Sequence, residues 1–150
     1  MHQIITYTSQ YQNACMAIFD SNCPPYFLPE ERQTYLDWLQ SEEALSNRYF
    51  VLLIDDQAVA SGGYYPRPNK KEVRLSWGMV HRDYHKKGIG SILTKFRLQA
   101  FVKEFPDWAC SINTSQHTEA FYQRYGFVTK SVVLNGFGEG LHDHYMIYQP

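Results

Sequence analysis

A basic, glycine-containing turn between an apolar strand and a long amphipathic helix most constrains how this chain can fold. Residues 80–91 read VHRDYHKKGIGS. Gly88 and Gly90 remove side chains from the backbone, and the first amides of a helix lack helical partners and carry the positive end of its dipole. Lys86 and Lys87 add positive charge beside those amides. The pattern favours a phosphate-binding unit, although a plain turn into a helix can also use glycine.

Length and composition limit the class of protein. The chain has 150 residues, of which 44% are hydrophobic and 19% charged, so we expect a single domain over residues 1–150. The formal charge of -1 gives no basic footprint for nucleic acid. The polar start, residues 1–6, and the lack of an apolar run near roughly 18 residues predict a cytoplasmic protein without a membrane partner. Three scattered cysteines are expected to be reduced thiols: Cys15, Cys23 and Cys110.

The residues on either side of the turn have clear periodicities. Residues 72–80 alternate as in a strand with one core face and one polar face. The face predicted to be apolar holds Val73, Leu75, Trp77 and Met79, and the other holds Glu72, Arg74, Ser76, Gly78 and Val80. After the turn, apolar residues recur at helical spacing until Pro106 ends the helix.

The rest of the chain alternates between strand-like and helix-like segments. Further strands are predicted at residues 4–8, 49–54, 58–65, 108–113, 127–134 and 145–148, and further helices at 11–20, from Pro29 onward and at 118–125. Residues 135–140 are predicted to be a glycine-rich loop. A hairpin early in the chain followed by strand-helix-strand units predicts an α/β protein with a mixed sheet.

A second motif follows the turn in the same order and context as in a known family. Phe121-Tyr122 precede Gly126-Phe127 with three residues between them. Together with residues 85–90, HKKGIG, this resembles the GNAT superfamily of acyl-CoA-dependent N-acetyltransferases. The phosphate motif of that family is Arg or Gln, two residues, Gly, one residue, then Gly or Ala, so His85 is its only departure here. The resemblance spans most of the chain.

The resemblance implies a fold and a co-substrate. The fold would be a single GNAT-like domain with a mixed, mostly antiparallel sheet of about seven strands and helices on both faces. Its fourth and fifth strands, residues 73–81 and 108–113, would splay apart. Acetyl-CoA would lie in that gap as co-substrate, with its pyrophosphate on the amides of residues 86–91 and its pantetheine arm along the fourth strand. The cofactor-binding residues implied are Met79, Val80, His85, Lys86, Lys87, Gly88, Ile89, Gly90, Ser91, Asn113, Phe121 and Tyr125.

The resemblance also implies aminolysis of a thioester, in which Tyr122 is the catalytic candidate. A thiol has a pKa of about 8.5 and a tyrosine about 10, so a neutral tyrosine can protonate the leaving sulfur as general acid. The alternative for Tyr122 is a core residue that closes a helix over the sheet. Backbone donors near Val80 would stabilise the oxyanion by analogy with the family.

The general base is open on the sequence. Many family members carry a glutamate on the fourth strand where this chain has Arg74. Glu72 lies on the same face and is the nearest substitute, so it is the second catalytic candidate, and a solvated strand-end charge is its alternative. Histidines could also take the proton. They are His81, His85, His142 and His144.

The remaining candidates concern the acceptor and metals. Arg74 and Ser76 could bind an acidic or hydroxylated group of the acceptor, or Arg74 could pair with Glu72 or another carboxylate. Residues 141–144, LHDH, lack a convincing third ligand, so no metal is predicted. This loop is expected to border the acceptor site together with residues 26–27.

Two function classes therefore remain. The first is an N-acetyltransferase that acts on a primary amine of a small molecule or peptide. The second is a catalytically silent acyl-CoA-binding sensor or scaffold. A P-loop protein is disfavoured because the turn lacks the Gly-Lys-Ser/Thr ending. The acceptor is not specified by any motif, and the resemblance makes a homodimer possible.

Overall fold

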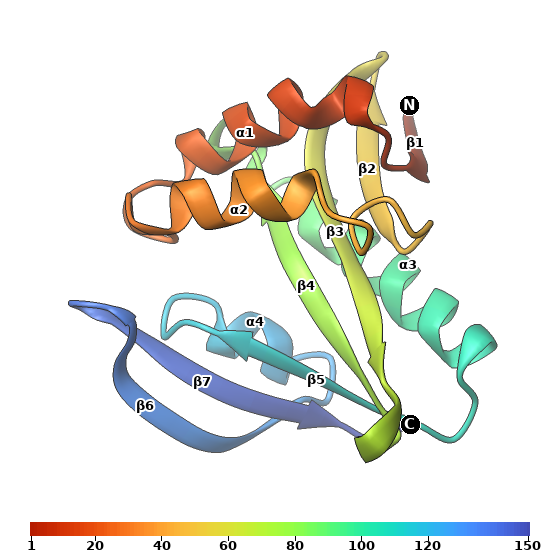
Figure 1. Ribbon diagram of the computed structural model, residues 1–150, viewed down its shortest axis with the longest axis vertical. Helices are drawn as coiled ribbons and strands as arrows, with labels where there is room; N and C mark the ends of the chain where they lie inside the picture. The colour runs from red at the N-terminus through yellow and green to blue at the C-terminus, as the bar shows by residue number, and fades with distance from the viewer.

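A seven-stranded sheet forms the frame of the protein in a computed structural model that describes residues 1–150 (Figure 1). The strands lie in the order β1-β2-β3-β4-β5-β7-β6. Their bounds are β1 His2–Thr6, β2 Tyr49–Ile54, β3 Gln57–Arg67, β4 Glu72–Val80, β5 Ala109–Thr114, β6 Val128–Gly138 and β7 Leu141–Tyr148. Only β4 and β5 pair in parallel. The predicted mixed, mostly antiparallel sheet of seven strands is confirmed.

Helices cover both faces of this sheet, as predicted. They are α1 Gln12–Ser21, α2 Glu31–Leu39, α3 Ile89–Glu104 and α4 Glu119–Gln123, with short 3₁₀ turns at Ser9–Tyr11, Pro68–Lys70 and Arg82–Tyr84. Figure 1 shows α1 and α2 side by side in front of the first strands, with α3 behind them. Two buried clusters reflect this layering, because α1 and α2 pack around Phe19 and Tyr35, whereas α3 and α4 share a cluster with Phe101 and Tyr122.

The face assignment predicted for β4 is wrong beyond its middle. Trp77 has a positive φ of 40°, and the register with β3 shifts there, from Ser76 opposite Gly63 to Met79 opposite Ser61. This β-bulge inserts one residue, so the alternation of side chains changes phase. Val73 and Leu75 pack in the cluster of Phe101, whereas Trp77 and Met79 pack with α1 and α2.

The hairpin between β6 and β7 is longer than the sequence predicted. The expected loop at residues 135–140 is mostly strand, since β6 continues to Gly138, which pairs with Leu141. The pairing is irregular between Val133 and Gly138, where Asn135 has a φ of 58° and Gly138 a φ of 146°. The glycines therefore form a bulge inside a ladder rather than a free loop.

The predicted splay lies between β4 and β5. Their pairing is confined to Glu72–Arg74 of β4 against Ala109–Ser111 of β5. Beyond this shared end the two strands separate, as Figure 1 shows. In the separated parts, the backbone groups on the facing edges of β4 and β5 do not pair with each other. These groups can therefore form hydrogen bonds with an extended ligand that enters the gap.

A charged contact ties the end of α3 to the sheet and makes stability depend on pH. Arg48 Nη2 lies 2.6 Å from Glu104 Oε2, and the Tyr64 hydroxyl donates to Oε1 at 2.8 Å. The hydrogen bonds from Arg48 hold the pKa of the Glu104 carboxyl below its usual range. A depressed folded-state pKa contributes stability that is present above the unfolded pKa, about 4.3, and is lost as the pH falls through the folded value.

We therefore expect Glu104→Gln to lower the Tm by about 1 to 3 °C at pH 6, because the half-exposed pair is partly screened. This difference from the wild type should shrink as the pH falls toward 3. Thermal unfolding at a series of pH values measures it, with Glu42→Gln on the exposed surface as the matched control. If the Tm difference between wild type and Glu104→Gln stayed constant down to pH 3, the charged Glu104 carboxylate would not be the source of this stability.

Candidate functional site

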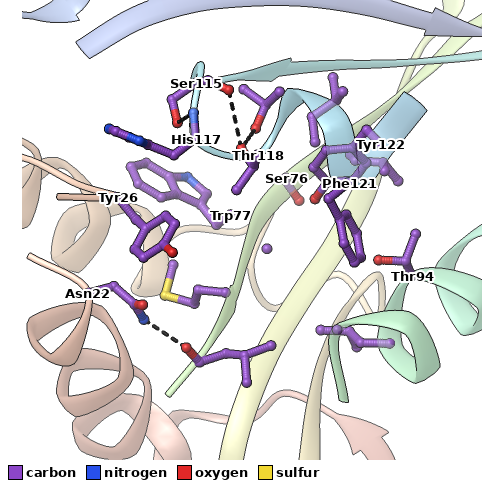
Figure 2. A pocket seen from close by; sticks show the side chains of 18 of the residues that line it. Asn22, Tyr26, Ser76, Trp77, Thr94, Ser115, His117, Thr118, Phe121 and Tyr122 are labelled. Carbon is purple, nitrogen blue, oxygen red and sulfur yellow. Dashed lines mark hydrogen bonds between the residues drawn. The ribbon is translucent and has the colours of Figure 1, made fainter. Parts of the chain in front are cut away.

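The gap between β4 and β5 is part of a cleft of about 1070 Å³. This volume lies slightly above the usual range of ligand cavities, roughly 300 to 1,000 Å³, and is large enough for an extended ligand. The cleft is lined by β4, the start of α3, the end of β5, α4 and the connection between α1 and α2. Figure 2 shows two groups of side chains in it, with Tyr26, Trp77 and His117 on one side and Phe121, Tyr122 and Thr94 on the other.

The start of α3 opens on this cleft without a cap from a side chain. Gly88 is the N-cap residue with a φ of 78°, and a Cβ built on it would meet no atom within 4 Å. Lys86, which has a φ of 61°, lies beside it and is exposed. The first amides of this 16-residue helix therefore face open space next to a cation, which fits a phosphate group.

Gly90 lies beside Phe121 and Val80, where a Cβ would make only ordinary van der Waals contacts. A Cβ at Gly90 would lie 3.5 Å from the Phe121 ring and 3.7 Å from Val80 Cγ2. Phe121 lines the cleft together with Ile89 and Ser91. Lys87 and Tyr125 do not line it: the Lys87 ammonium lies 5.2 Å from the Tyr84 ring centroid, and Tyr125 packs against the Phe121 ring at 5.2 Å.

The end of β4 presents backbone groups to the gap. The amide of His81 donates to Val59 O at 2.8 Å, so the alternation of an antiparallel ladder directs the amide and carbonyl of Val80 away from β3. The Val80 carbonyl accepts from Asn22 Nδ2 and from His85 Nε2, both at 2.8 Å. His85 thus fixes the turn to the strand, while the Val80 amide faces the gap.

The β5 side of the cleft holds an unpaired acceptor. Asn113 Nδ2 donates to Asp143 Oδ1 at 2.8 Å, whereas Asn113 Oδ1 is buried and has no hydrogen-bond partner. A buried polar atom without a partner costs free energy unless a ligand or water satisfies it. An N–H group of a ligand in the cleft would satisfy Asn113.

Tyr122 lies at the end of the cleft toward α3. Its side chain is buried on α4, and its hydroxyl accepts a hydrogen bond of 3.3 Å from Arg97 Nη2. Arg97 belongs to no recognised motif, although the spacing of Leu93, Arg97 and Phe101 places a charged residue within an apolar helical stripe. This break in the apolar stripe is the sequence feature that could have identified Arg97.

Glu72 lies away from the cleft, at the end where β4 and β5 still pair. It is not among the lining residues, and its two carboxylate oxygens accept from Arg67 Nη1 at 3.1 Å and from the Tyr145 hydroxyl at 2.7 Å. These bonds join β3, β4 and β7, which favours a structural role. The alternative for Arg74, an ion pair with Glu72 or another carboxylate, is not found, and Arg67 pairs with Glu72 instead. Arg74 lies over the Tyr145 ring and lines the cleft.

Of the histidines proposed as bases, only His85 lines the cleft. His144 donates to Glu119 at 2.7 Å, and His142 Nδ1 accepts from the amide of Asn135. His117, which no sequence motif marked, also lines the cleft, and its ring contacts Tyr26 edge-on with centroids 5.8 Å apart (Figure 2).

The opposite end of the cleft is aromatic and partly acidic. Trp77 lines it because the bulge turns its side chain toward α1 and α2, together with Tyr26, Phe27 and Trp38. Glu31 also lines this end, and burial raises the pKa of its carboxyl.

Two further observations concern metals and membranes. No three His, Cys, Asp or Glu side chains lie close enough together to hold a metal ion. None of the helices combines the length and apolar character needed to cross a bilayer.

Comparison with known proteins identifies the class. Residues 14–127 match the sequence profile of the acetyltransferase (GNAT) family. This match covers most of the chain, which therefore belongs to the GNAT family of acetyltransferases. No curated protein matches the chain significantly.

Solved structures share the fold at low identity. A GNAT-family protein from Desulfovibrio desulfuricans superposes with a TM-score of 0.82 and 18% identity, covering 99% of each chain. The ribosomal-protein-S18-alanine N-acetyltransferase of Escherichia coli has a TM-score of 0.78 and 18% identity, covering 99% of this chain and 94% of that one. An aminoglycoside 6'-N-acetyltransferase in complex with coenzyme A has a TM-score of 0.75 and 14% identity, over 98% and 96%.

Proposed function

We propose that this protein is an N-acetyltransferase that moves an acetyl group from acetyl-CoA to a primary amine of a small molecule or peptide in a ternary complex. One observation carries the proposal: the uncapped start of α3, which fits a phosphate, and the hydroxyl of Tyr122 belong to the same cleft. Family membership supports acyl transfer, and the choice of an amine as acceptor rests on the resemblance to N-acetyltransferases.

The residues present fit acetyl-CoA. The amides of residues 88–91 would hold the pyrophosphate, helped by Lys86 at the lining. The Val80 amide at the end of β4 and the unpaired Asn113 Oδ1 on β5 would serve as a donor and an acceptor for the amides of the pantetheine arm. The solved aminoglycoside 6'-N-acetyltransferase, which shares this fold, is in complex with coenzyme A, and this supports coenzyme A as the ligand.

Bound acetyl-CoA supplies an activated acetyl carbonyl and a sulfur leaving group. Tyr122 acts as general acid, giving its hydroxyl proton to that sulfur. The backbone at the end of β4 donates to the developing oxyanion, and a well-placed donor of this kind lowers the activation free energy by about 3 kcal/mol. Walls formed by Phe121, Leu93 and Ile89 exclude water from the thioester.

The acceptor amine would enter from the aromatic end. Tyr26 and Trp77 line the approach, and Arg74 and Ser76 are available for polar groups of the acceptor. Glu31 and His117 are the groups at this end that can take the proton released by the amine, and Glu72 is left out because its oxygens are already bonded.

The test is a panel of amines, amino acids, polyamines and peptides incubated with acetyl-CoA. Release of the CoA thiol is followed together with the mass of each product. We expect at least one amine to gain 42 Da at a rate well above that of the buffer control. Tight binding of acetyl-CoA with no acetylated product across the panel would instead support a silent binding module.

A further inference from the structure

Arg97 is a buried cation without an anionic partner. Its side chain is 1% exposed, and no carboxylate lies within salt-bridge distance of it. Its guanidinium donates to Gly63 O and to the Tyr122 hydroxyl, both at 3.3 Å, while Nε has no partner. An unpaired buried charge costs several kcal/mol, so packing alone would favour an apolar residue at this position of α3.

The sheet makes room for this guanidinium with two glycines. A Cβ at Gly78 would lie 2.8 Å from Arg97 Nη2, and a Cβ at Gly62 would lie 3.3 Å from its Cζ. Gly78 directly follows Trp77, where the β4 bulge turns the strand at the cleft. The absence of side chains on two neighbouring strands therefore lets the guanidinium lie close to the sheet, where it reaches the Tyr122 hydroxyl.

The other ionisable groups near Arg97 stay neutral. Burial raises the pKa of the Cys110 thiol to about 12 and raises the pKa of Tyr49 far above its usual value. Neither group can offset the guanidinium charge at neutral pH. The Tyr122 oxygen is the one atom hydrogen-bonded to Arg97 that gains negative charge during the proposed reaction.

We propose that Arg97 is a positioning residue for Tyr122, an inference that rests on the proposed function. Arg97 Nη2 can only donate, so Tyr122 accepts from it and its own hydroxyl hydrogen turns away from the guanidinium, into the cleft. When a carbon–nitrogen bond forms to the acceptor amine, the nitrogen gives up one proton to a base at the aromatic end of the cleft. The carbon–sulfur bond breaks, its electron pair goes to sulfur, and Tyr122 gives sulfur its own hydroxyl proton. The phenolate left behind is stabilised by the guanidinium until it is reprotonated from solvent.

A double-mutant cycle separates this role from a structural one. Arg97→Met is expected to lower kcat about tenfold in the wild type but less than about twofold in Tyr122→Phe, because both changes remove the same interaction. The KM for acetyl-CoA should stay within about twofold, and the Tm of Arg97→Met should equal or exceed that of the wild type, since an apolar residue replaces a buried charge. Arg97→Lys should restore part of kcat.

A second readout does not depend on activity. In protein labelled with [¹³Cζ]tyrosine, the signal of Tyr122 is identified by its loss in Tyr122→Phe. It should move in ligand-free Arg97→Met and return toward its wild-type position in Arg97→Lys, because the Cζ shift reports hydrogen bonding to the hydroxyl.

The outcomes distinguish the two proposals. If Tyr122→Phe itself leaves kcat unchanged, the proposed role of Tyr122 is wrong. Two results would overturn only the inference about Arg97. In the first, Tyr122→Phe lowers kcat and Arg97→Met lowers it a further tenfold in that variant. In the second, the Tyr122 signal does not move in Arg97→Met.

Discussion

Tyr122→Phe is expected to lower kcat for acetyl transfer by a factor of about 10² to 10³. General acid catalysis by a positioned side chain contributes typically 10²- to 10⁴-fold, and a phenylalanine keeps the ring but has no proton to give. The KM for acetyl-CoA should change little, because the change removes an interaction made in the transition state. Steady-state assays of CoA release with an amine that the wild type acetylates measure both constants.

Tyr148→Phe is the matched control for this substitution. Tyr148 packs in the same hydrophobic cluster as Tyr122, against Phe127, and it does not line the cleft. Removing its hydroxyl deletes the same atom from the same region, and kcat should stay within about twofold. A Tyr122→Phe variant as active as Tyr148→Phe would exclude Tyr122 as the acid.

Gly88→Leu is expected to abolish the stabilisation of the protein by acetyl-CoA. At a ligand concentration 100 times Kd, binding stabilises the native state by about 2.7 kcal/mol, which raises the Tm by about 5 to 10 °C. The open space beside Gly88 is the proposed phosphate site, and a leucine side chain there would fill it and block the amides of α3. Thermal shift with and without acetyl-CoA measures the loss.

Gly140→Leu controls for backbone strain. Gly140 has a φ of 80°, close to the 78° of Gly88, and a Cβ there would likewise meet nothing within 4 Å. Both variants should therefore lose a similar amount of intrinsic stability, but only Gly140→Leu should keep the acetyl-CoA shift. If acetyl-CoA raised the Tm of both variants by the same amount, the phosphate would bind elsewhere.

The α/β class and the mixed sheet could be predicted from residue patterns because those signals are local, whereas the seven strands and the splay were implied by the resemblance to the GNAT family. The strand at residues 72–80, the glycine turn and the apolar spacing of α3 each depend on a few neighbouring residues. The same holds for Gly88 and Tyr122, whose motifs place them at the start of one helix and the end of another. Gly88 follows β4 and Tyr122 follows β5 along the chain, and both residues line one cleft because these two strands are neighbours in the sheet.

The parts that the sequence did not reveal depend on contacts across the sheet. The bulge at Trp77 is a change of register between β3 and β4, and no residue pattern within β4 reports it. The hydrogen bonds of Glu72 with Arg67 and Tyr145 join three strands. The residue pattern within β4 alone does not show these partners, so it predicted Glu72 as a catalytic residue. Arg97 interrupts an apolar stripe visibly, but its bond to Tyr122 exists only after α3 and α4 pack together.

A crystal structure of the protein with coenzyme A tests the central claim most directly. The account predicts the diphosphate on the amides of residues 88–91, the pantetheine arm between β4 and β5 with hydrogen bonds to Val80, and the sulfur next to the Tyr122 hydroxyl. A cofactor bound outside the splay, or one whose sulfur points away from Tyr122, would contradict it.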